Sequence, residues 1–138
     1  MSHRVGFPVL VLVGVFGIAA IAADKPPDSY QMAMKDLGAF AQGIGKAVSD
    51  NDYAAIQKYS TSAVNAFAVA ETFWKGKADK DAVKLAQDGG KMAADLGVAA
   101  GLMSAEGVAY AAKGATDVCM NCHAAHRERM PDGTFQIK

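Results

Sequence analysis

The chain has 138 residues, of which 51% are hydrophobic and 20% are charged. This length fits one domain, and this composition excludes an intrinsically disordered chain. The 14 basic and 14 acidic residues balance to a formal charge of zero, and no block of lysine and arginine points to nucleic acid as a partner.

The first element is an N-terminal segment with the three parts of a secretory signal. Arg4 supplies a basic start, an uncharged apolar run follows over residues 5–23, and polar Asp24 comes directly after the small residues that end the run. We therefore predict a signal peptide over residues 1–22, a mature domain over residues 23–138, and export to a bacterial periplasm. The alternative is an uncleaved anchor, which would be the chain's one link to a membrane, since the run is nearly long enough to span a bilayer.

Four stretches with helical periodicity follow, separated by clusters of aspartate, serine, glycine and proline. They cover about residues 29–48, 53–74, 79–99 and 104–130, and the sequence Pro131-Asp132-Gly133 stops the last one. The residues expected on the inward faces are Tyr30, Met34, Leu37, Ala41, Ile44, Val48, Ile56, Ser60, Ala63, Phe67, Ala70, Trp74, Ala82, Leu85, Gly89, Met92, Leu96, Ala99, Val108, Ala112, Ala115, Cys119, Cys122 and His126.

No stretch shows the period-two alternation of a strand, so we predict an all-α fold. Four helices of similar length with short links pack most simply as an antiparallel four-helix bundle. Gly89 and Gly90 in the third helix cost about 1 kcal/mol each relative to alanine, which suits a close approach by another group or a local kink. The alanine-rich seam either reflects helix propensity or leaves room for something other than side chains.

Near the C-terminus, Cys119-Met120-Asn121-Cys122-His123 forms the C-x-x-C-H pattern of covalent haem attachment. On a helix, residues three apart share a face, so both thiols can reach the vinyl groups along one edge of a porphyrin. The adjacent His123 then brings its imidazole beneath the iron. The pattern predicts one covalent haem c, with Cys119 and Cys122 as its thioether attachments and His123 as the proximal iron ligand.

Three other chemistries use similar residues. A thioredoxin-like dithiol also has C-x-x-C, but it needs a βαβ context that is not visible in this sequence. A zinc site could use Cys119, Cys122, His123 and His126, but four ligands in a row along one helix do not surround a tetrahedral ion. A disulfide suits an exported protein, yet it leaves His123 without a role.

The placement of this motif on the last of four helices resembles the class II c-type cytochromes, which are cytochrome c-prime and its low-spin, methionine-ligated relatives. Their pattern reads C-x-x-C-H-x-x-aromatic-Arg near the chain end, and here Arg127 follows His123 by four residues. Residues 34–38 (MKDLG) are similar to the family's Met-Lys-x-Leu-Gly segment in the first helix. The resemblance implies a haem-binding bundle for the whole mature chain.

Several positions depart from the family pattern. Tyr30 stands where members often carry an arginine that contacts a haem propionate, and His126 stands at the aromatic position before Arg127. We expect Tyr30 to contact the haem pocket, Arg127 to contact a propionate, and His126 to reach a propionate or lie at the surface. The alternative for Arg127 and Arg129 is to complement the helix dipole alone. The shortened link between the second and third helices leaves a homodimer of the family type an open question.

Met34 is the candidate distal iron ligand, because it lies on the inward stripe and at the family position that faces the iron. Met32 points about 200° away around the helix, and Met92 and Met103 are expected to face inward as core filler. The alternative for Met34 is the same filling role. A bound thioether raises the potential and suits electron transfer, whereas an empty distal face leaves iron open to nitric oxide or carbon monoxide.

Together these features predict an exported monohaem c-type electron carrier that works with redox partner proteins and is not an enzyme. One alternative is a five-coordinate, gas-binding protein of the cytochrome c-prime type. A second alternative is a haem enzyme such as a peroxidase, which needs a distal acid–base pair that the sequence does not reveal.

Overall fold

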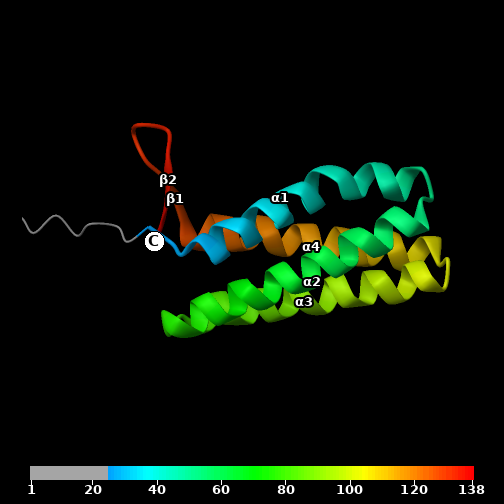
Figure 1. Cartoon of the computed structure of the whole chain (residues 1–138), viewed down its shortest axis with the longest axis horizontal. Helices are drawn as coiled ribbons and strands as arrows, with labels where there is room; N and C mark the ends of the chain where they lie inside the picture. Colours follow the sequence, from blue (N-terminus) through cyan, green and yellow to red (C-terminus); the bar gives the residue numbers. More distant parts are fainter. Residues whose placement is uncertain (1–24) are drawn as a thin grey trace, which may run out of the picture.

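Four helices in sequence order form the body of the molecule (Figure 1). The computed structural model describes residues 25–138, and the predicted signal peptide with its cleavage point lies outside this range. The helices are α1 (Asp28–Ser49), α2 (Tyr53–Gly76), α3 (Lys80–Gly101) and α4 (Ala105–His126), followed by strands β1 (Arg127–Arg129) and β2 (Phe135–Ile137). No helix among residues 25–138 has the length and apolar character needed to cross a bilayer.

Side-chain caps determine where three of the helices begin. The side chains of Asp52, Asp79 and Ser104 accept hydrogen bonds from the backbone N–H three residues further on, at 2.9, 3.0 and 3.2 Å. Such bonds satisfy amide groups that have no partner within the first helical turn. The starts predicted near Asp79 and Ser104 are therefore confirmed.

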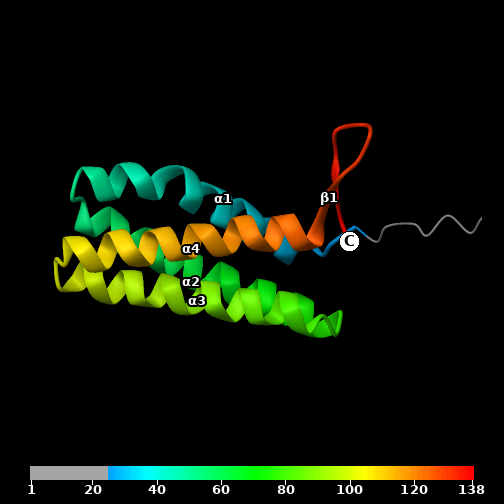
Figure 2. The same ribbon diagram turned by 180° about the vertical axis from the view of Figure 1, so that it is seen from behind.

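The three links between helices share one backbone design. Asn51, Ala78 and Met103 adopt the left-handed conformation, with φ of 54°, 56° and 53°. The next residue then donates its backbone N–H to the carbonyl five residues earlier, at 2.9, 3.3 and 2.9 Å, which is the outer bond of a Schellman motif. Each link is short, so consecutive helices run antiparallel, as predicted (Figures 1 and 2).

The core follows the predicted helical faces, most closely in α2. All six residues expected inward on that helix are buried: Ile56, Ser60, Ala63, Phe67, Ala70 and Trp74. The buried Ser60 hydroxyl donates to the Ala93 carbonyl of α3 at 2.7 Å, so its polarity is satisfied. Helix α2 packs along α1 and α3, and α3 packs along α4, whereas α1 meets α4 over a much smaller area.

Gly89 serves a close packing contact. A Cβ atom at this position would lie within 2.8 Å of three carbons of the Phe67 ring. The glycine therefore lets the Phe67 ring pack against the α3 backbone. This is the close approach by another group that we expected at Gly89, because a glycine in a helix is otherwise unfavourable.

Two residues expected inward lie elsewhere. Met103 is 71% exposed, because α3 ends at Gly101 and Met103 belongs to the following link. Ala41 is exposed where it borders a cavity between α1 and the other helices. Met32 is 63% exposed, which confirms that it points away from the core.

The end of the chain differs from the prediction of a helix to Met130 and a short tail. Helix α4 stops at His126, and β1 and β2 then pair antiparallel with Arg127 opposite Ile137. Gly133, with φ of 85°, and the Asp132 carboxylate, which accepts from the Thr134 backbone at 2.9 Å, build the turn. The strands have three residues each, which is too short for their alternation to register as a pattern.

Candidate functional site

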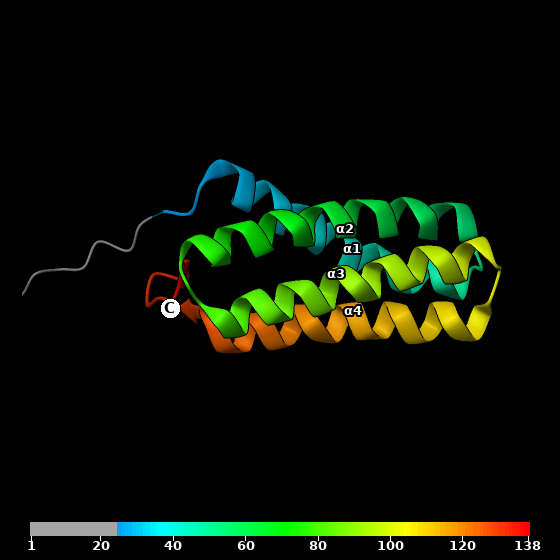
Figure 3. The same cartoon turned by 90° about the horizontal axis from the view of Figure 1, so that it is seen from below.

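A cavity of about 170 Å³ lies among all four helices near the end of the bundle where the hairpin projects. We call this the hairpin end; the described N-terminal residues and the C-terminus lie there as well (Figures 1 and 3). The walls are predominantly apolar and include Leu37, Phe67 and Leu85. Its lining also contains the residues on which the sequence prediction depends, which are Tyr30, Met34, Cys119, Cys122 and His123.

Helix α4 presents its three motif residues to this one cavity. Cys119 and Cys122 are free thiols and half-buried, and His123 lies at the rim with its side chain partly in solvent. Their spacing of three residues places the two sulfur atoms on the same face of the helix, because the α-helix has 3.6 residues per turn. Cys119 and Cys122 therefore lie on the inward face predicted for α4 and line the cavity.

Burial keeps both thiols in the protonated form. It raises the pKa of Cys119 to about 11, with a smaller contribution from Cys122. It also raises the pKa of Cys122, to which the negative charges of Asp79 and Asp81 add. Redox-active C-x-x-C thiols instead have lowered pKa values and often sit at helix N-termini, whereas this motif lies at the C-terminal end of α4, where the helix dipole disfavours negative charge.

The surroundings of His123 favour its neutral form. Burial lowers the pKa of the imidazole, and the positive charge of Arg127 lowers it further. A neutral imidazole has a free nitrogen lone pair, which is the form that binds a metal. Within residues 25–138, no three histidine, cysteine, aspartate or glutamate side chains converge as a ready metal site.

Met34 reaches the cavity from α1. It is half-buried and borders both core clusters of the bundle. The neighbouring Gly38 also lines the cavity, and a Cβ atom at this glycine would meet nothing within 4 Å. By contrast, Met92 packs on Gly114 between α3 and α4 and does not line the cavity.

His126 turns away from the cavity. Its Nδ1 atom lies 3.2 Å from the Asp79 carboxylate and its Nε2 atom 3.0 Å from that of Asp81, while its ring packs on Trp74 with centroids 5.2 Å apart. It thereby ties the last turn of α4 to the first turn of α3. The motif helix is anchored just beyond His123.

Arg127 belongs to β1 and not to the helix. Its guanidinium carbon lies 3.4 Å from the centroid of the Phe135 ring, a cation–π contact across the hairpin. Ile137 of β2 packs on the core cluster that contains Tyr30 and Trp74. The hairpin thus covers part of this end of the bundle. The sequence analysis did not predict this hairpin.

Tyr30 is buried at the hairpin end in an aromatic cluster. Its ring lies 4.1 Å from that of Phe73 and 6.2 Å from that of Trp74, measured between centroids. Burial raises the pKa of Tyr30 to about 12, and the nearby Cys122 adds to this rise, while a side-chain hydrogen bond with Trp74 and the positive charge of Arg127 oppose it. The phenol is neutral at physiological pH, and the side chain lines the cavity.

Two cavity residues escaped the sequence prediction. Trp74 was expected in the core, and the structure adds that it lines the cavity with its indole Nε1 buried beside the Tyr30 side chain. Met120, between the two cysteines, is 57% exposed at the cavity rim. The sequence marks both as apolar, but their surroundings depend on tertiary packing.

Comparison with known protein families, curated proteins and solved structures found no match for this chain.

The residues that line the cavity fit a covalently attached haem. The walls are apolar, two protonated thiols and a neutral imidazole come from one helix, and a thioether comes from another. The cavity is partly open to solvent, and its volume of about 170 Å³ is smaller than the roughly 300–1,000 Å³ of typical cofactor clefts. A tetrapyrrole would need more room, which a wider separation of the loosely packed helices α1 and α4 would provide.

Proposed function

We propose that this chain is a monohaem c-type cytochrome that carries single electrons. One observation carries the proposal: Met34 of α1 lines the same apolar cavity as Cys119, Cys122 and His123 of α4. A chance C-x-x-C-H sequence gives no reason for an apolar cavity at the motif or for a thioether from a different helix. The resemblance to the class II c-type cytochromes is consistent with this proposal.

Each residue has one task in the proposed site. Cys119 and Cys122 form the thioether bonds, and their low tendency to ionise keeps them from acting as a redox dithiol. His123 would hold the iron through its imidazole and Met34 through its thioether. A haem held by these two residues would supply one-electron exchange at a raised potential.

The surroundings of Met34 support electron transfer over catalysis. Leu37 and Gly38 lie beside it along the cavity wall, and neither can donate or accept a proton through its side chain. Tyr30, one turn earlier on α1, also lines the cavity, but its pKa of about 12 is too high for a general base at neutral pH. Peroxide cleavage needs a positioned acid–base group on that side. We therefore do not assign an enzymatic role.

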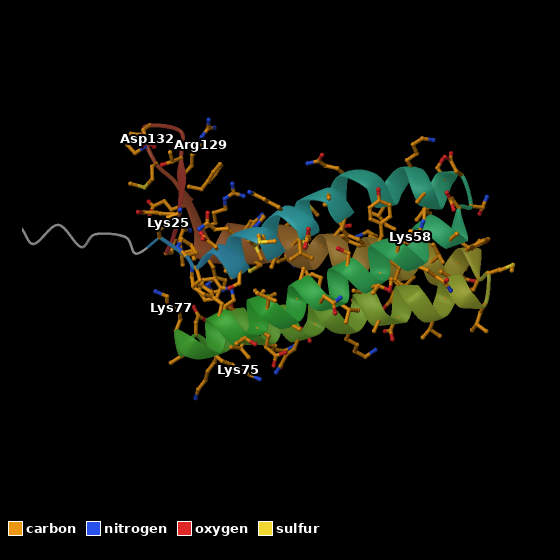
Figure 4. All side chains as sticks on the ribbon, in the orientation of Figure 1. Lys25, Lys58, Lys75, Lys77, Arg129 and Asp132 are labelled. Carbon is orange, nitrogen blue, oxygen red and sulfur yellow. The ribbon has the colours of Figure 1, made fainter. Side chains whose placement is uncertain are left out.

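The surface around the cavity indicates what a redox partner would meet. Met120 is exposed at the rim, and Lys77, Arg129 and Asp132 lie at the same end of the bundle (Figure 4). Charges of both signs thus lie at the same end of the bundle as the exposed Met120, so we expect the proposed partner to dock on a mixed surface. The proposed periplasmic location rests on the N-terminal sequence.

The proposal is tested by expressing the full chain in a bacterium that attaches haem c. We expect a coloured protein whose pigment stays with the polypeptide in acidified organic solvent, and loss of both attachments in a C119S/C122S variant. The ferric spectrum should show a thioether-to-iron charge-transfer band, and the reduced protein should bind carbon monoxide poorly. A colourless protein would refute haem binding, whereas ready carbon monoxide binding would assign the gas-binding alternative.

A further inference from the structure

The part of α4 that carries the haem-attachment motif is not fixed by core packing. The last buried residue of α4 is Ala115, and none of residues 116–126, which form about three turns, is fully buried. Val118 and Cys119 pack on the core only in part, because this segment borders the cavity. Another contact must therefore hold this end of the helix.

His126 supplies this contact from the last residue of α4. Its Nδ1 atom lies 3.2 Å from the Asp79 carboxylate, and its Nε2 atom lies 3.0 Å from that of Asp81. The ring packs on Trp74 in the last turn of α2, and the side chain is only 12% exposed, so water competes little for these contacts. The other side-chain hydrogen bonds that residues 116–126 make within the described chain stay inside α4.

The contact is directional because of the chemistry of its groups. Carboxylates only accept hydrogen bonds, so an imidazole that faces one at each ring nitrogen satisfies both as an imidazolium, which donates from both nitrogens. The second oxygen of Asp79 caps α3 by accepting from the Ala82 backbone N–H at 3.0 Å, which fixes the orientation of this carboxylate. A cation at the end of α4 and anions at the start of α3 also complement both helix dipoles.

We propose that His126 is a positioning residue that holds the motif segment, residues 119–123, at the cavity through its contacts with α3. His126 lies three residues beyond His123, which is about 4.5 Å along the helix axis. Fixing the end of the helix therefore sets the direction in which the His123 imidazole and the two thiols face. This inference rests on the proposed function, in which the motif segment holds the haem.

The test compares two replacements of His126. His126→Phe keeps a ring that packs on Trp74 but donates no hydrogen bond, whereas His126→Arg donates from several nitrogens and also stacks on aromatic rings. In the haem-loaded chain, the g-values of the ferric electron paramagnetic resonance spectrum report the orientation of the axial imidazole, and they should shift in His126→Phe alone. In the haem-free chain, amide exchange protection of residues 119–123 should fall about tenfold in His126→Phe, with α2 unchanged, and should be retained in His126→Arg.

The matched control is Lys113→Met, which removes an ion pair with Asp117 that stays within α4 and should change neither readout. Asp81→Ala guards against misfolding of His126→Phe, because Asp81 is 71% exposed and its loss leaves His126 in place. Both readouts should change in Asp81→Ala in the same direction. Original g-values and protection in His126→Phe and Asp81→Ala, or an equal loss in His126→Arg, would overturn this inference alone. A chain that attaches no haem would overturn the proposed function as well, which pigment retention detects separately.

Discussion

Replacing Gly89 by alanine tests whether the packing of α3 controls the size of the cavity. The added methyl group would lie within 2.8 Å of three carbons of the Phe67 ring, which is 4% exposed and forms part of the cavity wall. Overpacking of this kind costs about 1–3 kcal/mol, and the gain in helix propensity offsets about 1 kcal/mol. We expect a net loss of about 1 kcal/mol in the free energy of unfolding.

The matched control is Gly45→Ala, because Gly45 is exposed on α1 and a Cβ atom there meets nothing within 4 Å. This variant should gain about 1 kcal/mol from helix propensity alone. Urea unfolding followed by circular dichroism of the haem-free chain measures both changes. If Gly89→Ala proved as stable as Gly45→Ala, the contact between Phe67 and the α3 backbone could not be as close as the structure has it.

The same substitution has a second readout at the site. The Phe67 ring lines the cavity, so we expect it to move into the cavity when the new methyl group displaces it. The yield of covalently bound haem per polypeptide should therefore fall in Gly89→Ala and stay unchanged in Gly45→Ala. An equal yield in both variants would show that Phe67 does not limit the space available to the ligand.

Three further predictions address the distal ligand, a helix link and the buried phenol. Met34→Ala should convert the ferric haem spectrum to a high-spin form and abolish the thioether charge-transfer band. Met92→Ala should leave the spectrum unchanged and lower the free energy of unfolding by at most about 2–5 kcal/mol. Ala78→Gly should stabilise the chain by up to about 1 kcal/mol in urea unfolding, because Ala78 has a φ of 56° that glycine adopts freely. The pKa of Tyr30 is raised from 10.0 to about 12, so between these values the unfolded chain loses a proton that the folded chain keeps; stability should fall as pH rises through this window, and less steeply in Tyr30→Phe.

The helices could be predicted from the sequence because local signals and core packing agree. Asp79 and Ser104 cap helices that start where the apolar stripes start, and all six predicted positions on α2 are buried. The hairpin could not be predicted, since three-residue strands carry almost no periodic signal and Pro131 reads equally well as a helix stop. The inward orientation predicted for Met103 was wrong, because this residue lies in the link after Gly101, where the helical periodicity of α3 no longer applies.

The candidate site also contains residues that the sequence could reveal and residues that it could not. The motif residues Cys119 and Cys122 are recognisable because their spacing is local, and Met34 follows from helical periodicity. The burial of the Trp74 indole beside Tyr30 depends on tertiary packing, and the partners of His126 lie more than forty residues away in the sequence. Haem attachment and the identity of the distal ligand stay predictions.

The arrangement of α1 has a mechanical consequence for ligand entry. Within residues 25–138, the covalent link of α1 to the other helices runs from Ser49 to Tyr53, at the end opposite the cavity, and α1 packs along α2 but contacts α4 much less. A helix rises about 1.5 Å per residue, so Met34 lies about 22 Å from this link, and a rotation of about 5° about it would displace Met34 by about 2 Å. A small tilt of α1 would therefore widen the cavity on the α4 side, and the contact of α1 with α2 would resist this movement.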